Sequence, residues 1–471
     1  MSNPEQSDVL IVGAGVAGLA AAVAVSGTGR RVTLLERKPY VGGRAYSYPH
    51  PALDEVIDSQ HVLLGCCTNL IDLCKLSGAD RHIRWYDNIT FLEPATASRP
   101  VRRSEIGPGV LPSPGHSSLS FLRARMLSLT DKSRIAVGLL EFLRGYPQND
   151  DEPFSAWLTR TKQTERAVRH FWEPVIVGAL NDSFDRCSTR YAARVFYESF
   201  LKSAQGGRLG IPTQPLSEFY ASIVQLAERQ GTVFRARASV ERIERLGNGL
   251  WQITVSDGNQ YSAESLLLAL PFEQTQRLLE TLPVDSPQRQ RILPMLQHFS
   301  HAPITTIHLW FDRTITHLDH AALLDTRIQW FFNKSRIRRD EVGDTHPGQY
   351  LELVISASFA ELHQTREQIL ASAIAELSRF FPAVAQANIL KSGILKEARA
   401  TFSVVPGLDA FRPTADAPGD GLYLAGDWIR TGWPSTMEGA VRSGRLAASA
   451  IANETFLTPD LPANGLMALL V

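Results

Sequence analysis

A strand followed by a glycine-rich turn and a helix, near the start of the chain, limits what this sequence can fold into. Val9–Val12 is short, apolar and mostly β-branched, which is typical of a strand buried on both faces. The glycines after it have GxGxxG spacing; they are Gly13, Gly15 and Gly18. Such glycines permit a tight turn, let the backbone approach a pyrophosphate, and let the helix pack on the strand. Ala17–Val25 continues as an alanine-rich helix, whose N-terminal N–H groups favour a phosphate.

A carboxylate at the end of the next strand completes this pattern. Arg31–Leu35 reads as a second strand, and Glu36 follows it, eighteen residues after Gly18. A carboxylate at this position accepts hydrogen bonds from a ribose hydroxyl. The alternative interpretation, a helical hairpin that happens to contain glycines, does not explain why a carboxylate stands at Glu36. The sequence therefore predicts an α/β fold with a Rossmann-like, dinucleotide-binding domain.

A second glycine motif distinguishes FAD from NAD. Gly42, Gly43 and Arg44 begin six residues after Glu36. This glycine pair with arginine resembles the second fingerprint of the superfamily of flavoprotein amine oxidases, phytoene desaturases and GDP-dissociation inhibitors. Glycines bring the backbone near the cofactor phosphates, and an arginine stabilises their charge. The resemblance implies FAD, bound in a fold of glutathione reductase type.

The end of the chain returns to the same domain. Leu422–Ala425 reads as a strand, Gly426 and Asp427 end it, and Met437–Ala452 reads as a helix. In the flavoproteins that this segment resembles, the aspartate contacts the ribityl or pyrophosphate part of FAD. The helix N-terminus near Thr436 points its positive dipole end at the flavin ring, which stabilises negative charge on reduced flavin. Both ends of the chain are therefore expected to complete one cofactor site.

The predicted cofactor-binding residues come from several distant segments. They are Gly13, Gly15, Val16, Ala17, Gly18, Glu36, Arg37, Gly43, Arg44, Val240, Gly426, Asp427, Thr436 and Met437. No metal site is expected, because the four cysteines make no CxxC pair and no zinc spacing. We expect them to be reduced, mostly buried thiols in a cytoplasmic protein.

The middle of the chain reads as insertions into the nucleotide domain. Two amphipathic helices are expected between Ser117 and Gly145, the second with Thr130 or Asp131 as its N-cap. Thr232–Ile243 alternates like a strand of the returning nucleotide domain. We therefore expect an inserted α+β substrate domain. The expected division gives 1–100, 205–285 and 400–456 to the FAD-binding domain, 101–204 and 286–399 to the substrate domain, and 457–471 to a tail.

Length and charge narrow the class of protein. With 471 residues, the chain is expected to hold two or three domains. Lysine plus arginine equals aspartate plus glutamate at 48 each, so no nucleic-acid partner is expected.

The first eight residues are polar and lack the basic region of a signal peptide. Val9–Val25 is apolar but falls short of the ~20 residues that a membrane span needs.

Several motifs narrow the resemblance further. They are "DSQHVLLGCC", "IRWYDNITFLEP", "FWEPVIVGALN", "QWFFNKS" and "AGDWIRTGWPSTMEGAVRSG". In order and spacing these motifs resemble hydroxysqualene dehydroxylases, also called squalene-associated FAD-dependent desaturases, of bacterial hopanoid synthesis. Relatives commonly have Asp-Asn-Gly-Gln-His where this chain has Ile57 to His61, so the family aspartate falls one position before Asp58.

The resemblance implies reductive removal of the hydroxyl of hydroxysqualene, which gives squalene. The alcohol is flanked by an alkene, so loss of water leaves an allylic cation, and hydride from N5 of reduced flavin can reach that carbon. The leaving hydroxyl requires a proton donor. The substrate is a long apolar isoprenoid, so a long apolar tunnel with few polar groups is expected. No separate NADH site is legible, and the electron donor that reduces the flavin stays unidentified.

The polar stretch that begins at Asp58 is the predicted catalytic segment, because it lies directly before an apolar run. His61 is the expected proton donor, since imidazole titrates near neutrality. Gln60 is expected to orient His61 or the alcohol, and Asp58 is the third predicted member. Alternatively, Gln60 and His61 only hydrogen-bond backbone or flavin and do no acid chemistry. The rival polar candidates are Asn181 and Asp182.

A substrate drawn from a bilayer implies membrane contact. The helices between Ser117 and Gly145 carry arginine and lysine among Leu, Phe and Met, and the final "GLMALLV" is apolar. Either segment can dip into lipid; the alternatives are core-facing helices and a disordered tail. We expect peripheral association with the inner face of the membrane.

Three rival functions stay open. A carotenoid-type desaturase has the same fold and runs hydride from substrate to oxidised FAD. An amine oxidase usually has an aromatic residue directly before Met-Glu-Gly, where this chain has Thr436. A GDP-dissociation inhibitor holds a prenylated protein and has a degraded cofactor site, whereas Glu36, Arg44 and Asp427 are all present here.

Overall fold

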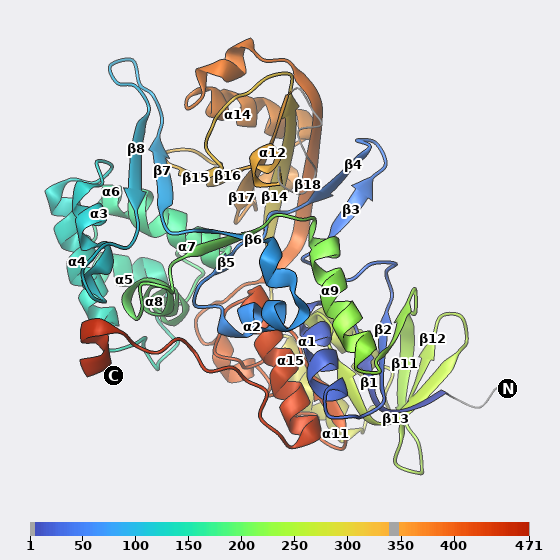
Figure 1. Cartoon of the computed structure of the whole chain (residues 1–471). Coiled ribbons are helices and arrows are strands. Elements are labelled where there is room, and N and C mark those ends of the chain that lie inside the picture. The colour runs from blue at the N-terminus through green and yellow to red at the C-terminus, as the bar shows by residue number, and fades with distance from the viewer. Residues whose placement is uncertain (1–4, 339–347, 471) are drawn as a thin grey trace.

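The computed structural model describes residues 5–338 and 348–470, which build two large β-sheets with helices around them (Figure 1). The first four residues of the polar N-terminal stretch and the last residue of the expected tail lie outside the described residues. Within the described ranges, no helix has both the length and the apolar character needed to cross a membrane.

The first sheet gathers strands from the beginning, middle and end of the chain. Its order is β10-β2-β1-β13-β12-β11, and β19 pairs with β13. β10, β2, β1, β13 and β19 run parallel, whereas β12 and β11 are antiparallel. The bounds are β1 Glu5–Val12, β2 Val32–Glu36, β10 Val233–Ala236, β11 Val240–Arg245, β12 Trp251–Val255, β13 Gln260–Leu268 and β19 Leu422–Leu424. This arrangement confirms the predicted Rossmann-like domain.

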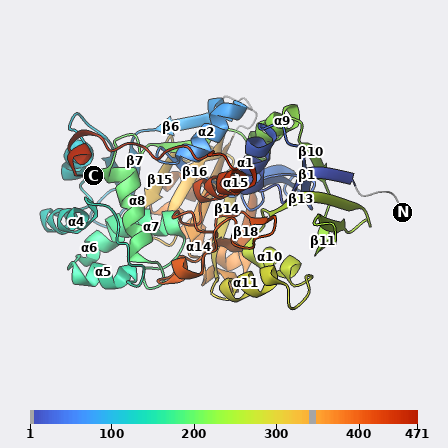
Figure 2. The same ribbon diagram turned by 90° about the horizontal axis from the view of Figure 1, so that it is seen from below.

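Three helices pack beside this sheet (Figures 1 and 2). They are α1 (Val16–Ser26), α9 (Leu216–Arg229) and α15 (Met437–Ala452). Every residue of β2 is buried, which explains why this strand carries no alternating polar face. The predicted strand at residues 232–243 divides into β10 and β11, because Arg237 lies between them with φ +59° and ends the extended run.

Helices α1 and α15 approach each other closely enough for their backbones to touch. A Cβ atom at Gly444 of α15 would lie 2.1 Å from the carbonyl oxygen of Ala17 and 3.1 Å from the backbone nitrogen of Ala21. A Cβ atom at Gly18 would lie 1.9 Å from the carbonyl oxygen of Gly13. The two glycines therefore fix the first helix against the last helix and against the turn that precedes it.

The second sheet has the order β18-β14-β17-β16-β15-β7-β8. Its bounds are β7 Ile89–Glu93, β8 Arg102–Ile106, β14 His301–Phe311, β15 His320–Leu323, β16 Trp330–Asn333, β17 Gln349–Ser356 and β18 Ile389–Phe402. Helix α14 (Arg366–Ser378) packs on it, and Ile307, Leu353 and Leu377 are fully buried between them. The predicted domain division places β7 in the FAD-binding domain, because β7 precedes residue 100. In the structure, β7 is a strand of this second sheet.

Short elements and further helices complete the chain. A hairpin of β3 and β4 and a small sheet of β5, β9 and β6 lie between the two large sheets (Figure 1). Their bounds are β3 Ser47–His50, β4 Glu55–Asp58, β5 Leu63–Leu64, β6 Ile83–Tyr86 and β9 Leu209–Pro212. The remaining α-helices of the described residues are α2 Thr68–Ser77, α3 Ser118–Arg123, α4 Leu129–Phe142, α5 Phe154–Arg160, α6 Glu165–Ala167, α7 Glu173–Leu180, α8 Thr189–Phe196, α10 Phe272–Leu279, α11 Pro287–Leu296 and α12 Lys334–Ile337.

The two helices predicted between residues 117 and 145 are confirmed as α3 and α4, but the predicted N-cap of α4 is wrong. Ser128 is the N-cap, and its hydroxyl accepts the N–H of Asp131 at 3.2 Å. The Asp131 carboxylate accepts the N–H of Ser128 at 2.7 Å in return. Asp131 is thus the third residue of a capping box rather than the cap itself, because its carboxylate reaches back one turn.

We expect Gly444→Ala to lower the free energy of unfolding by about 1–3 kcal/mol, because the added methyl group must push α15 away from α1. Thermal and denaturant unfolding measure the change. Gly247→Ala is the matched control, since a Cβ atom there meets nothing within 4 Å. Equal stability of the two variants would contradict the close contact of the helices.

Candidate functional site

The first glycine motif forms an open cradle at the N-terminus of α1. Gly13 has φ +103°, and its N–H donates to the carbonyl of Leu35 at 2.7 Å. Gly15 is the N-cap of α1, and no side chain caps this helix end. A Cβ atom at Gly15 would meet only the Cα of Gly43, at 3.7 Å. The free N–H groups of the first turn therefore face a space that a phosphate can approach.

Glu36 closes the same turn from the end of β2. Its Oε2 accepts the N–H of Ala14 at 2.8 Å, and its Oε1 accepts the N–H of Lys38 at 2.9 Å. An ionised carboxylate offers about four lone-pair sites, so two remain for ribose hydroxyls. Glu36 thus sits where the spacing predicts it, as a fixed acceptor beside the cradle.

The second glycine motif packs against the first. The N–H of Gly42 donates to the carbonyl of Ala14 at 2.9 Å. Gly43 has φ +67°, and a Cβ atom there would lie 3.1 Å from the Cα of Gly15. The sequence motifs at 13–18 and 42–44 therefore form one surface.

Arg44 connects this surface to the end of the chain. Its guanidinium forms an ion pair with the Oδ1 of Asp427, and the hydroxyl of Ser435 donates to the Oδ2. Arg412, which is fully buried, donates to the carbonyls of Asp427 at 2.9 Å and Ile429 at 2.6 Å. Asp427 is thus held through both its side chain and its backbone, 383 residues from Arg44.

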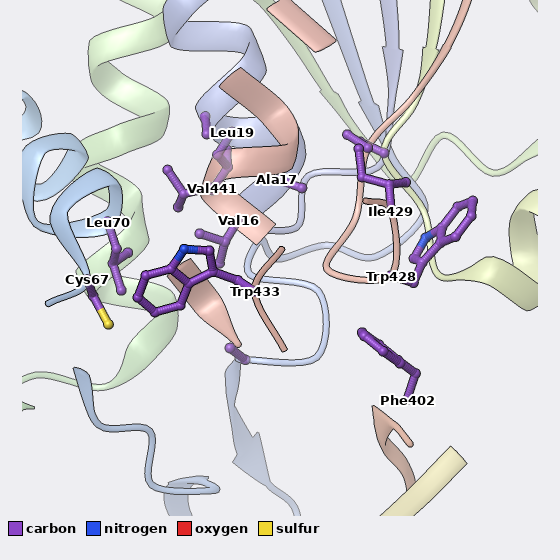
Figure 3. Close-up of a cluster of buried hydrophobic side chains, with 14 of the residues drawn as sticks. Val16, Ala17, Leu19, Cys67, Leu70, Phe402, Trp428, Ile429, Trp433 and Val441 are labelled. Atoms are coloured by element: carbon purple, nitrogen blue, oxygen red, sulfur yellow. The ribbon is translucent and has the colours of Figure 1, made fainter. Parts of the chain in front are cut away.

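Helix α15 begins next to this ion pair. Thr436 is its N-cap, and the Thr436 hydroxyl accepts the N–H of Gly439 at 3.1 Å. Figure 3 shows apolar side chains on both sides of the helix start, with Leu70 and Trp433 on one side and Trp428 on the other. The positive end of the α15 dipole therefore lies next to this ion pair and these apolar side chains, where it can act on a bound group.

Four predicted cofactor residues have less specific placements. Val16 and Ala17 are buried in the first turn of α1, and Arg37 is exposed beyond Glu36. Val240 is half-buried at the start of β11. Just before it, the N–H of Ala238 donates to the carbonyl of Glu36 at 2.8 Å and holds this segment to the first sheet. Gly426 and Met437, two further predicted residues, make contacts inside the protein. Gly426 donates its N–H to the hydroxyl of Ser443 at 2.8 Å, and the Met437 sulfur accepts the Tyr220 hydroxyl at 3.1 Å.

These residues fit FAD as one set. The uncapped N-terminus of α1 suits a pyrophosphate, Glu36 suits a ribose, and Arg44 with Asp427 suits the segment between phosphate and ring. Glycine at 15 and 43 leaves room for the cofactor, which any side chain there would fill.

Glu438 has a structural role that sequence reasoning missed. It is fully buried in the first turn of α15, where its carboxylate accepts the N–H groups of Asn69 at 3.2 Å and Leu70 at 2.8 Å. The carboxylate therefore caps the N-terminus of α2 from the neighbouring helix. Arg412 was missed as well, because it lies outside the motif that contains its partners and bonds to backbone carbonyls, which leave no signal in the sequence.

A group of four ionisable side chains contacts the predicted catalytic segment. This buried ionic cluster consists of Asp58, Lys334, Arg338 and Glu352. The Nζ of Lys334 lies 3.1 Å from the Oδ1 of Asp58 and 3.1 Å from the Oε2 of Glu352. The Nη2 of Arg338 lies 2.9 Å from the Oδ2 of Asp58. The cluster joins β4 to α12 and to β17 of the second sheet.

The cluster sets the charges of its carboxylates. Although burial opposes ionisation of Asp58, the charges of Lys334 and Arg338 hold its pKa below the usual range. Asp58 is therefore ionised and does not donate a proton at neutral pH. Burial raises the pKa of Glu352 to about 7, against the opposing charge of Lys334. Burial also lowers the pKa of His308 to about 3, so this neighbour is neutral.

Gln60 bonds directly to this cluster, and through Gln60 the cluster also holds His61. The Gln60 amide accepts from the Nζ of Lys334 at 2.6 Å and donates to the carbonyl of His61 at 2.7 Å, so it holds the main chain of His61 rather than its ring. The backbone N–H of Gln60 donates to Glu352. The Nδ1 of His61 lies 2.7 Å from the carbonyl of Ser59, which fixes the proton on Nδ1 in the neutral ring. Within the described part of the chain nothing bonds to the Nε2, which can accept or, after protonation, donate.

His61 also lies within electrostatic reach of the cofactor-binding residues. Burial lowers its pKa, the carbonyl of Ser59 and the charge of Asp58 raise it, and Lys334 and Arg44 lower it further. The influence of Arg44 links the predicted catalytic segment to the second glycine motif. The sequence could not indicate this, because nothing in residues 44–61 fixes how the β3–β4 hairpin folds back.

The rival polar candidates are engaged in contacts inside the protein. Asn181 ends α7 with φ +55°, and its side chain donates to the hydroxyl of Thr401 at 2.9 Å and accepts the N–H of Ala357 at 2.7 Å. The carboxylate of Asp182 is fully buried and accepts from Arg186 at 3.0 Å. Asn181 thus holds the helical layer on the second sheet, whereas Asp182 stabilises the turn that follows α7.

Comparison with known proteins agrees with the cofactor geometry. The family described as flavin containing amine oxidoreductase matches residues 16–452. The 15-cis-phytoene desaturase of Narcissus pseudonarcissus is 25% identical over 470 residues, covering 96% of this chain and 80% of the relative. The zeta-carotene desaturase of Synechocystis sp. is 24% identical and covers 94% and 96%. Putrescine oxidase bound to putrescine has a TM-score of 0.71 at 17% identity, covering 95% and 99%. With the fit described above, FAD is the cofactor.

The raised pKa of Glu352 makes a prediction about stability. In the unfolded chain the carboxyl loses its proton near its ordinary value of 4.5, whereas in the folded protein it keeps the proton up to about pH 7. The folded state binds more protons between these values, so stability falls as the pH rises through this window. We expect wild type to lose about 2 kcal/mol relative to Glu352→Gln between pH 5 and pH 7.5.

Unfolding at both pH values measures this difference, with Glu241→Gln on an exposed strand position as the control. A constant gap between wild type and Glu352→Gln would show that Glu352 is ionised throughout.

Proposed function

The chain belongs to the flavin containing amine oxidoreductase family, and from that premise we propose that it removes the hydroxyl of hydroxysqualene reductively to give squalene. The protein is an FAD-dependent oxidoreductase, and the proposal concerns its substrate and the direction of the reaction. When bound and reduced, FAD supplies a hydride. Hydride and one proton are taken up for each water released, so the protein must also provide a proton donor.

The observation that carries the proposal is the environment of His61. Its Nε2 has no hydrogen-bond partner among the described residues, its other ring nitrogen is fixed by Ser59, and the charge of Arg44 acts on the ring. A protonated Nε2 at this position can give its proton to a leaving hydroxyl. Gln60 and the buried ionic cluster hold the segment in place. Asp58, which is ionised, is a positioning residue in this scheme.

The relatives support a long isoprenoid substrate. The two relatives compared above by sequence are named for phytoene and zeta-carotene, which are long isoprenoid hydrocarbons. The residue before Met437 is threonine, and its hydroxyl is used to cap α15. An aromatic side chain that encloses an amine is therefore missing from this position, which favours a hydrocarbon substrate over an amine.

A carotenoid-type desaturase is the second candidate, because both of these relatives are desaturases. The two candidates differ in the direction of hydride transfer. A dehydroxylase in the reduced state should be reoxidised by hydroxysqualene, whereas a desaturase in the oxidised state should be reduced by phytoene.

We expect anaerobically reduced holoprotein to regain the oxidised flavin spectrum when hydroxysqualene is added, with one squalene formed per flavin. Stopped-flow absorbance and product analysis by mass spectrometry measure the two quantities. Oxidised holoprotein mixed with phytoene is the matching experiment. Reduction of flavin by phytoene, with no response to hydroxysqualene, would favour the desaturase and overturn the proposal.

We expect His61→Ala to lower the turnover number by about 10²–10⁴-fold with FAD still bound, because the leaving hydroxyl loses its proton donor. In wild type, turnover should fall as the pH rises through the pKa of His61, which burial holds below the ordinary 6.5. The variant should lack this dependence. His317→Ala, at an exposed position, is the control. Unimpaired turnover in His61→Ala would remove His61 from the mechanism.

A further inference from the structure

Exposed apolar side chains are concentrated in two segments of this protein. Of the sixteen large apolar residues exposed in the described ranges, ten lie in residues 110–140 and 466–470. They are Val110, Leu111, Leu119, Leu122, Leu129, Val137, Leu140, Leu466, Leu469 and Leu470. Three of them protrude far into solvent, because Val110 is 93%, Leu469 is 81% and Leu129 is 79% exposed. We call these ten residues the apolar face.

The fold brings the two segments together. A short turn at Gly465–Leu469 packs on the loop after β8, where the N–H of Leu466 donates to the carbonyl of Ser113 at 2.8 Å. Met467 is fully buried and anchors this turn, which leaves the neighbouring leucines outside. Figures 1 and 2 both show the C-terminal turn at the end of the molecule occupied by α4.

Helices α3 and α4 continue the same face. The Nζ of Lys132 in α4 donates to the carbonyl of Leu122 in α3 at 2.8 Å and ties the two helices together. On α4, Leu129, Val137 and Leu140 share a stripe at helical spacing that faces solvent, while the opposite stripe is buried. An exposed apolar stripe of this kind indicates that something else covers it.

The charged residues exposed around the apolar face are mostly positive. The arginines are Arg123, Arg125, Arg134 and Arg144, and none of their side chains has an ion-pair partner among the described residues. The exposed acid of α4, Glu141, already bonds to Arg160. The carboxylate of Asp131 is used within the capping box. Positive charge is therefore available to a negatively charged partner.

We propose that this face docks onto the surface of a lipid bilayer that contains anionic headgroups. Protruding leucines can enter the boundary between headgroups and acyl chains, and unpaired arginines can contact lipid phosphates. A second copy of the chain suits the face less well, because a symmetric contact would bring the arginines of both copies together. The inference rests on exposed side chains and their charges and does not depend on the substrate proposed above.

Vesicle binding tests the proposal directly. FAD-loaded protein is mixed with vesicles of phosphatidylcholine, with or without phosphatidylglycerol, and the bound fraction is measured by flotation. We expect binding to the anionic vesicles, weakened by added salt. Leu122→Ser and Leu469→Ser should each lower the partition coefficient about tenfold. Leu76→Ser and Leu390→Ser are the matched controls, since these leucines are 57% and 60% exposed elsewhere on the molecule.

The charge contribution has its own control pair. The double variant Arg123→Gln/Arg134→Gln should bind anionic vesicles more weakly than wild type. The control double variant Arg229→Gln/Arg277→Gln changes the net charge by the same amount and should bind as wild type does. Flavin absorbance and circular dichroism confirm that each variant is folded. The proposal fails if wild type binds neither type of vesicle, or if the control variants weaken binding as much as the variants in the apolar face. It also fails if the leucine variants convert a dimer to a monomer without changing vesicle binding.

Discussion

The ion pair between Arg44 and Asp427 is the interaction on which the rest of the site depends. It joins two segments that are 383 residues apart, and it lies where the second glycine motif meets the start of α15. The pair stays in register because α1 and α15 touch at Gly444 and because Arg412 holds the backbone of Asp427. The chain can therefore insert a whole second sheet between the two segments without opening the cofactor site.

A second electrostatic constraint couples that inserted sheet to the segment that carries His61. Asp58, Lys334, Arg338 and Glu352 are buried together, and removing charges from water is costly unless each one is paired. The cluster therefore has few alternative arrangements, and it fixes the segment that carries His61. Placement of the His61 side chain thus depends on residues of β4, α12 and β17 as well as on its own segment.

The parts of this structure that follow from local rules were predictable from the sequence. The glycines at 13–18, the carboxylate of Glu36 and the helix Met437–Ala452 occupy their predicted places, because turn geometry and helix periodicity are local properties. Lys334 and Glu352 were not predictable, since each becomes a partner of Asp58 or Gln60 only after the sheets assemble. The N-cap of α4 and the break at Arg237 were missed because they depend on a single side chain or a single φ angle.

A double-mutant cycle on FAD affinity tests the central claim that both ends of the chain hold one cofactor. The dissociation constant is measured by fluorescence titration of cofactor-free protein for wild type, Arg44→Met, Asp427→Asn and the double variant. We predict that both single variants weaken FAD binding and that their effects are coupled by about 1 kcal/mol or more, because the two side chains act as one unit. Additive effects, or wild-type protein that does not bind FAD, would contradict the account.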